Sequence, residues 1–225
     1  MDKSSYTLIT FDVYTALFDI ETSLTPIVHD TLKIEALSFV RAWRSKQLEY
    51  ALISNSLGAT RIPFEALTRR SLDDTLFRHM LNPSEVIRTE LVHAWHHLCP
   101  WQESAKVVQS LHERGYTLGL LSNGDHALLD ELSKTFPPVF EHIFSSEEAG
   151  YYKPHPSIYA LPFQRLGIPV TSLLHVAGSP TDVLGAKSAG LQCGWSNRLG
   201  QPYLDINHKA DYELKDLSGL LDILK

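Results

Sequence analysis

A single carboxylate, Asp12, directly follows a short apolar run at residues 8–11 and is a candidate nucleophile. The reference pKa of an aspartate is ~3.9, so at neutral pH the group is already ionised and needs no base to activate it. It has only to be directed, partly desolvated, at an electrophilic carbon or phosphorus. The alternative is a turn or helix-capping aspartate, which is common after a strand.

A second polar group, Ser122-Asn123-Gly124, follows the apolar run at residues 116–121. Its hydroxyl, its amide and the backbone N–H groups of a tight turn could converge on an anionic group of a substrate. Asn-Gly is also a strong turn dipeptide, so a turn without chemistry remains the alternative.

Lys153 and Asp182 could complete a charged site with Asp12. Lys153 lies in the stiff, partly apolar segment AGYYKPHPSIY, which could hold its ammonium near Asp12, although a lysine before proline is often only a solvated loop residue. Two unit charges ~4 Å apart gain roughly 4 kcal/mol at an effective dielectric of 20. Asp182 begins a predicted helix, where the helix dipole favours an acid, and it could also orient Lys153.

The elements that must position these residues alternate between strands and helices after residue 100. Such alternation predicts an α/β fold with a doubly wound parallel sheet covered by helices on both faces. The predicted strands are 7–11, 116–121, 139–145, 173–176, 192–195 and 211–214, and the predicted helices are 103–114, 128–136, 156–166, 183–189 and 217–224.

Residues 23–97 carry apolar residues at helical spacing almost throughout, with breaks near residues 56–58 and 82–83. We expect this block to be a helical cap inserted over the carboxyl edge of the sheet, where ligands bind in such folds. The predicted division is a core domain of residues 1–17 plus 98–225 and a cap domain of residues 18–97.

Composition excludes several classes of function. The chain has 225 residues, 44% of them hydrophobic, and a net charge of −6 without a basic run, so we expect no nucleic-acid or membrane partner. No apolar stretch approaches the ~20 residues of a membrane span, and the N-terminus lacks a secretory pattern. Cys99 and Cys193 form no disulfide framework, which indicates a reducing cytoplasm.

Taken together, the motifs FD-x-Y, LSNG, YKP-x-x-x-x-Y and SP-x-D-x-x-GA, in this order, resemble those of the haloacid dehalogenase superfamily. The resemblance runs over essentially the whole chain and implies a Rossmann-like core with a helical cap. Tyr159 matches the tyrosine that ends the third motif.

Tyr14 places the chain nearest one branch of that superfamily. Phosphatases of the superfamily have aspartate there, and this second acid protonates the leaving alcohol; a tyrosine, with a pKa near ~10, cannot readily replace it. The branch with tyrosine here is the type II hydrolytic 2-haloacid dehalogenases, whose halide leaves without a proton. One carboxylate beside a lysine is a poor site for a hard dication, so we expect no metal and no cofactor.

The segment AWRSKQLEYALISNSL, residues 42–57, resembles part of the helical cap of those dehalogenases. By resemblance, Arg44 would receive the departing halide, with Gln47, Glu49 and Tyr50 in support. The alternative is a surface arginine on a charged helix face.

Two places depart from the family pattern. The family usually has Gly-Thr where this chain has Thr15-Ala16, and a serine and an asparagine where it has Ala177 and Ser179. That asparagine and its neighbours position the hydrolytic water, and losing one such donor can cost roughly 3–4 kcal/mol. The nucleophilic half-reaction therefore looks equipped, whereas the hydrolytic half looks weakened.

The resemblance implies hydrolysis of a small 2-haloalkanoic acid through an ester on Asp12. Lys153 would hold Asp12, Asp182 would hold Lys153, and Ser122 would bind the substrate carboxylate. The pocket is predicted to be completed by Tyr14, Asn123, Tyr159 and Ser179. The alternatives are a magnesium-dependent phosphohydrolase and a catalytically weak scaffold that binds a carboxylate or a protein partner. A homodimer is plausible by resemblance.

Overall fold

The computed structural model describes residues 6–57 and 61–224. Contacts between residues divide the chain into two compact units, which we call the core unit and the helical unit. The core unit comprises the chain through Phe18 and from Pro100 onward, and the helical unit is Asp19–Cys99. The sequence predicts divisions after residues 17 and 97.

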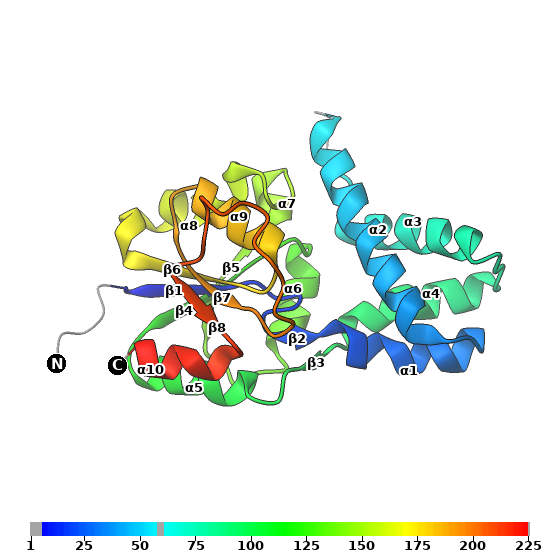
Figure 1. Cartoon of the computed structure of the whole chain (residues 1–225), viewed down its shortest axis with the longest axis horizontal. Helices are drawn as coiled ribbons and strands as arrows, with labels where there is room; N and C mark the ends of the chain where they lie inside the picture. Colours follow the sequence, from blue (N-terminus) through cyan, green and yellow to red (C-terminus); the bar gives the residue numbers. More distant parts are fainter. Residues whose placement is uncertain (1–5, 58–60, 225) are drawn as a thin grey trace. The chain divides into compact units, whose positions relative to one another are not determined.

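The core unit contains a parallel sheet in the order β5-β4-β1-β6-β7-β8 (Figure 1). This order confirms the predicted doubly wound α/β class. The strands are β1 (Leu8–Phe11), β4 (Thr117–Ser122), β5 (Phe140–Ser145), β6 (Leu173–Ala177), β7 (Gln192–Ser196) and β8 (Tyr212–Leu214).

Strand β1 lies at the centre of this sheet, and every residue of it is buried. Leu8 pairs with Thr117 of β4 on one side and with Leu173 of β6 on the other. The strands that follow β1 in the chain lie on both sides of it, with β4 and β5 on one side and β6, β7 and β8 on the other. The carboxyl end of β1 is therefore the topological switch point, where doubly wound folds bind ligands.

Helices cover both faces of the sheet. Figure 1 shows α5 and α10 on one face and α8 and α9 on the other. Apolar side chains of α8 and α9 pack with those of β6 and β7 into a buried cluster that includes Ile158, Val183 and Trp195. The helices of the core unit are α5 (Ser104–Glu113), α6 (His126–Ser133), α7 (Ser146–Ala149), α8 (Pro156–Leu166), α9 (Pro180–Ser188) and α10 (Leu220–Ile223).

Three of the predicted helices have other bounds in the structure, and the short helix α7 was not predicted. Helix α9 begins at Pro180 rather than Val183, because proline suits the first turn and Ser179 caps the helix. Helix α6 ends at Ser133, ahead of Pro137 and Pro138, instead of reaching residue 136. The predicted helix at 217–224 is a 3-10 turn followed by the short α10.

The helical unit contains α1 (Ile20–Leu32), α2 (Ala36–Ser56), α3 (Phe64–Arg78), α4 (Glu85–His93) and a 3-10 turn, Ala94–His96. Trp43 and Trp95 meet edge to face at 5.5 Å in its core. The predicted breaks agree with the ends of α2 and α3, although Gly58 lies outside the described residues. A further break, at Lys33 with φ of 55°, was not predicted.

Two very short strands, β2 (Phe18–Asp19) and β3 (Cys99–Pro100), pair where the chain passes from one unit to the other. They are too short to produce a periodic pattern, and the sequence did not predict them. Among the described residues, none of the helices is long and apolar enough to cross a membrane.

Candidate active site

Asp12 lies immediately beyond β1, at the switch point. Its backbone N–H donates to the carbonyl of Val176 at 2.9 Å, which ties the end of β1 to β6. The residue is 7% exposed, so the carboxylate is largely desolvated. The apolar run of β1 therefore delivers a buried anion to the carboxyl edge of the sheet.

The Lys153 ammonium lies between two carboxylates. Its Nζ is 3.2 Å from Oδ1 of Asp12 and 2.9 Å from Oδ2 of Asp182, and Lys153 is itself 7% exposed. Burial alone would lower the pKa of Lys153, but the attraction of the two carboxylates outweighs it and raises the pKa above the ordinary value. Lys153 is therefore a cation that holds Asp12 in place.

Asp182 is held on every side by hydrogen-bond donors. Tyr159 donates its hydroxyl to Oδ1 at 2.8 Å, while Lys153 and His175 both lie within 3.0 Å of Oδ2. Burial tends to raise the pKa of Asp182, yet Lys153 and His175 together hold it well below its usual range. This carboxylate is therefore a fixed anion that orients Lys153.

His175 is a member of this network that the sequence analysis did not identify. It lies in β6, fully buried, with Nε2 3.0 Å from Asp182 and 3.4 Å from the Lys153 ammonium. Desolvation lowers the pKa of His175 below its ordinary value. The available signal was a histidine inside the otherwise apolar strand LLHVA, seven residues before the acid.

Ser122 and Asn123 make different contacts with the charged residues Asp12 and Lys153. Ser122, fully buried at the end of β4, places its hydroxyl 3.5 Å from Oδ1 of Asp12. Asn123 accepts the backbone N–H of Lys153 through its side-chain oxygen at 2.7 Å. Its own carbonyl accepts the hydroxyl of Ser146 at 2.7 Å. Asn123 therefore fixes the lysine loop, while Ser122 lies beside the Asp12 carboxylate.

Tyr14 is 1% exposed and lies close to the turn that follows β4. A Cβ built on Gly124 would lie 2.7 Å from the Tyr14 hydroxyl, so glycine at this position leaves room for the phenol. A neutral phenol thus lies two residues after Asp12, where a second carboxylate would be needed to protonate a leaving alcohol.

The loop after Asp12 packs tightly against the loop after β6. Thr15 adopts a φ of 78°, in the left-handed region that favours glycine. A Cβ on Gly178 would lie 2.3 Å from the Ala16 nitrogen and 2.5 Å from the Thr15 hydroxyl oxygen. Thr15 therefore occupies a glycine-like position, and Gly178 is what allows the two loops to approach.

Of the three polar groups expected in these loops, two are absent and the third position is engaged in capping a helix. Ala16 and Ala177 are both fully buried and bring a methyl group where a hydroxyl was expected. The Ser179 hydroxyl accepts the backbone N–H of Asp182 at 3.3 Å and thereby caps α9. The reduced polarity of these loops agrees with the departures in the sequence.

Arg44 lies in α2 of the helical unit and is half-buried. It donates a short hydrogen bond to Gln47, whose amide donates in turn to Thr68 at 2.6 Å. Its guanidinium lies 5.7 Å from the centre of the Trp95 ring. Gln47 is buried, whereas Glu49 is exposed and pairs with Lys46. Arg44 is thus ordered by its own unit rather than being a freely solvated arginine.

The residues around Asp12 do not fit a magnesium ion. The ammonium of Lys153, 3.2 Å from Oδ1 of Asp12, occupies a place where a cation would bind, and Tyr14 supplies no charge. Mg²⁺ prefers carboxylates and several waters in octahedral geometry. Within the described part of the chain, no cluster of three or more His, Cys, Asp or Glu side chains is arranged to hold a metal.

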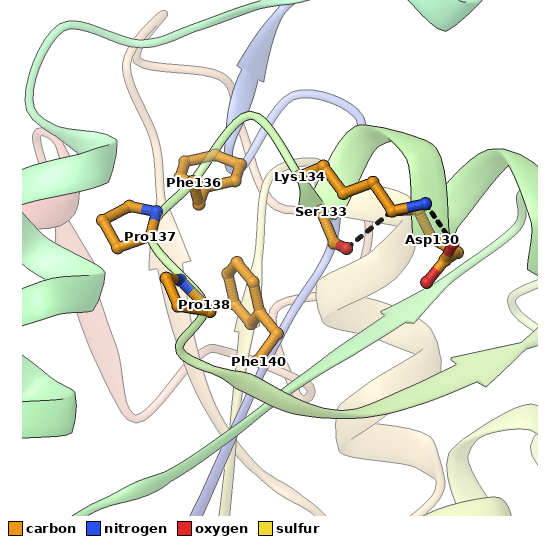
Figure 2. A pocket seen from close by; sticks show the side chains of 7 residues that line it. All are labelled: Asp130, Ser133, Lys134, Phe136, Pro137, Pro138 and Phe140. Atoms are coloured by element: carbon orange, nitrogen blue, oxygen red, sulfur yellow. Dashed lines mark hydrogen bonds and ion pairs between the residues drawn. The ribbon is translucent and has the colours of Figure 1, made fainter.

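A separate hollow of about 410 Å³ lies where α6 leads into β5 (Figure 2). Phe136 and Phe140, in contact at 5.5 Å, form part of its wall, and the Lys134–Asp130 ion pair lies on its α6 side. The other lining residues are Ser133, Pro137 and Pro138. None of the predicted site residues lines it.

Comparisons with known proteins agree with these features. A model of the haloacid dehalogenase-like hydrolase family matches residues 8–190. Haloacetate dehalogenase H-2 of Moraxella sp. (strain B) is 30% identical over 96% of both chains. A (S)-2-haloacid dehalogenase of Pseudomonas putida is 27% identical over 94% of this chain and 93% of its own. The crystal structure of an L-2-haloacid dehalogenase superposes with a TM-score of 0.92 at 27% identity, covering 97% of this chain and 98% of its own.

Proposed function

The chain belongs to the haloacid dehalogenase-like hydrolases, and from that premise we propose that it hydrolyses the carbon–halogen bond of small 2-haloalkanoic acids. The proposed products are a halide ion and a 2-hydroxy acid. The relatives that match nearly the whole chain are named as dehalogenases of haloacetate and of 2-haloacids. This supports a substrate that carries both a halogen and a carboxylate.

One observation carries the proposal: a buried carboxylate 3.2 Å from a buried ammonium, with a phenol where a second acid would lie. An ionised Asp12 needs no base, because it attacks as it is. A halide leaves as an anion and needs no acid, so Tyr14 in place of an aspartate removes nothing that the reaction requires.

In the proposed first step, an oxygen of Asp12 attacks C2 of the substrate from the side opposite the halogen. The new C–O bond forms as the carbon–halogen bond breaks, the halide leaves with the bonding electrons, and C2 is inverted. Lys153 keeps Asp12 ionised and directed, and Ser122 contributes a hydroxyl for the substrate carboxylate. Asn123, Tyr14 and Tyr159 support the pocket. From the family resemblance, we propose that Arg44 binds the departing halide.

In the proposed second step, water attacks the carbonyl carbon of the Asp12 ester. The C–O bond from that carbon to the product oxygen breaks, Asp12 is regenerated, and the 2-hydroxy acid leaves. Ala16 and Ala177 bring methyl groups where donors for this step were expected, while Ser179 caps a helix. We therefore expect ester hydrolysis to be slower than ester formation.

Chloride release from 2-chloropropionate tests the proposal. The wild-type chain should release chloride, and Asp12→Asn should release none. Asp130→Asn, on the surface of α6, is the matched control and should keep wild-type activity. Absence of halide release across chloro-, bromo- and fluoro-substituted 2-haloacids would reject the proposal. Magnesium-stimulated release of phosphate from phosphomonoesters would support the phosphohydrolase instead.

A catalytically weak protein that binds carboxylates is a second candidate, and the methyl groups of Ala16 and Ala177 favour it. Such a protein would be stabilised against heat by propionate or lactate without any turnover, because a ligand that binds the folded state raises the apparent stability. Stabilisation accompanied by halide release would reject it.

We also propose that the chain forms a homodimer through α2. Leu48 and Leu52 lie one helical turn apart on this helix and are 38% and 45% exposed, and Ile53 and Leu57 extend the apolar surface. Light scattering should show a dimer that Leu52→Glu converts to a monomer. Val86→Glu, at an exposed apolar position of α4, should leave the dimer intact.

The proposed location is the cytoplasm. Cys99 and Cys193 are both free thiols, as expected for a chain that folds in a reducing compartment. Cell fractionation followed by detection of the protein in the cytoplasmic fraction is the test.

A further inference from the structure

His175 is a fully buried titratable side chain to which the proposed mechanism gives no role. It lies in β6, where its Cα partners are Thr10 in β1 and Cys193 in β7. Partners in register point to the same face of a sheet, so these three side chains lie together beneath α8 and α9. The ring of Tyr159 meets the imidazole edge to face at 6.0 Å.

The contacts of the imidazole define where its proton lies. Nε2 is 3.0 Å from Oδ2 of Asp182, and an ionised carboxylate can only accept, so Nε2 must carry the hydrogen. In the neutral ring Nδ1 is then the acceptor, and the hydroxyl of Thr10, 3.0 Å away, is its donor. The backbone of Thr10 also interacts with the ring and raises the pKa of His175, against the larger lowering by desolvation. The Thr10 hydroxyl thus donates to Nδ1 of His175, and Nε2 of His175 donates to the Asp182 carboxylate.

Burial favours this neutral form, because desolvation lowers the pKa of His175 and the Asp182 carboxylate, which raises it, does not offset that effect. The groups that face the ring are Asp182 from α9, Lys153 from its loop, Tyr159 from α8, Thr10 from β1 and Cys193 from β7. The Lys153 ammonium, 3.4 Å from Nε2, would repel an imidazolium. Both atoms carry hydrogens, so this approach is a close packing contact rather than a hydrogen bond.

We propose that His175 and Thr10 form a positioning pair that holds the Asp182 carboxylate, and through it the Lys153 ammonium, in the orientation that Asp12 needs. Oδ2 of Asp182 receives both Lys153 and His175, so the imidazole fixes the direction of the carboxylate to which the ammonium is bound. Without His175 the carboxylate could turn toward Lys153 alone and draw the ammonium away from Asp12.

Two experiments test this role, and the first of them, steady-state kinetics, rests on the proposed function. His175→Phe keeps a ring but removes both hydrogen bonds, and should lower kcat for 2-haloacids about ten- to a hundredfold with KM changed less than about twofold. His175→Gln retains an N–H near the place of Nε2 and should recover most of that loss. A merely structural role would not depend on the donor.

A milder pair of variants guards against misfolding of the histidine variants. Thr10→Val is nearly isosteric, removes only the hydroxyl that donates to Nδ1, and should lower kcat about threefold or more. Thr75→Val is the matched control, because Thr75 is equally buried and its hydroxyl donates to a helix carbonyl in the helical unit. It should leave kcat unchanged.

Nitrogen-15 NMR of the imidazoles tests the pair without any turnover. The His175 signals, assigned by their loss in His175→Gln, should show a protonated Nε2 and an unprotonated Nδ1. They should stay unchanged as the pH falls through ~6.5, where a free imidazole takes up its proton. In Thr10→Val the Nδ1 signal should shift.

Three results would overturn the inference: a proton on Nδ1, an imidazolium at neutral pH, or wild-type kcat in both His175→Phe and Thr10→Val. A wild-type chain that releases no halide would instead reject the proposed function. In that case the NMR signature by itself tests the positioning pair, so failure of the proposed function and failure of the inference are distinguishable.

Discussion

Replacing Lys153 by methionine removes the ammonium between Asp12 and Asp182 while keeping most of the volume of the side chain. At an effective dielectric of 20, the attraction is roughly 5 kcal/mol across the 3.2 Å contact with Asp12 and roughly 6 kcal/mol across the 2.9 Å contact with Asp182. The desolvation of three buried charges offsets much of this. Removing one partner of a buried pair nevertheless costs about 3–5 kcal/mol, because the remaining charges are left uncompensated.

The loss of unfolding free energy in Lys153→Met should depend on pH in a defined direction. In the wild type the pKa of Asp182 is held below its unfolded value, so its stabilising contribution is present above about pH 4 and is lost only as the pH falls through the depressed pKa. In Lys153→Met the two buried carboxylates have no cation and favour protonation. The gap in unfolding free energy should be widest near pH 7–8 and should narrow toward about pH 4.

Urea denaturation followed by circular dichroism at several pH values measures this gap. Lys134→Met is the matched control, because Lys134 contacts Asp130 at 2.7 Å, a shorter distance than either contact of Lys153, yet its side chain is 71% exposed. Solvent screens such a pair, so the control should change stability little at any pH. Equal losses in the two variants, or a loss in Lys153→Met that does not vary with pH, would refute the reasoning.

Three further predictions concern the loops and the acid. Thr15→Gly should raise the free energy of unfolding by about 1 kcal/mol, because glycine adopts the φ of 78° without strain, whereas Thr117→Gly within β4 should lower it; chemical denaturation checks both. Gly178→Ala should cost about 1–3 kcal/mol in the same assay, since its Cβ would lie 2.3 Å from a backbone nitrogen, and an unchanged midpoint would contradict this. Tyr159→Phe should cost about 1.5–3 kcal/mol in the same assay, because Asp182 loses a donor at 2.8 Å; an unchanged midpoint would contradict this.

The sheet and its carboxyl edge could be predicted because apolar runs and stop signals are local. The runs that became β1 and β4 are short and are each followed by a polar residue, and the run that became β6 leads into the loop that contains Ser179. Parallel strands bring these ends to one edge of the sheet. This geometry places Asp12, Ser122 and the β6 loop near one another before any contact is known. Helix α8, from Pro156 to Leu166, also has the predicted bounds, since proline begins it and Gly167 ends it.

The features of the site that the sequence did not predict depend on contacts between residues distant in sequence. His175 joins the charged group because β6 lies beside β1, which places Thr10 and Asp182 at its two nitrogens. The left-handed conformation of Thr15 depends on its packing against Gly178, and no propensity of threonine indicates it. Asn123 binds the backbone of the lysine loop, a contact that the LSNG motif by itself does not specify.

Intact-mass spectrometry after brief incubation with 2-bromopropionate, followed by peptide mapping, most directly tests whether Asp12 is the nucleophile. The account predicts a covalent adduct of one carboxyethyl group on the peptide that contains Asp12, formed together with one equivalent of bromide and lost slowly to water. Asp12→Asn should form no adduct. Bromide release without any adduct in a rapid-quench series, or an adduct on another residue that persists in Asp12→Asn, would contradict it.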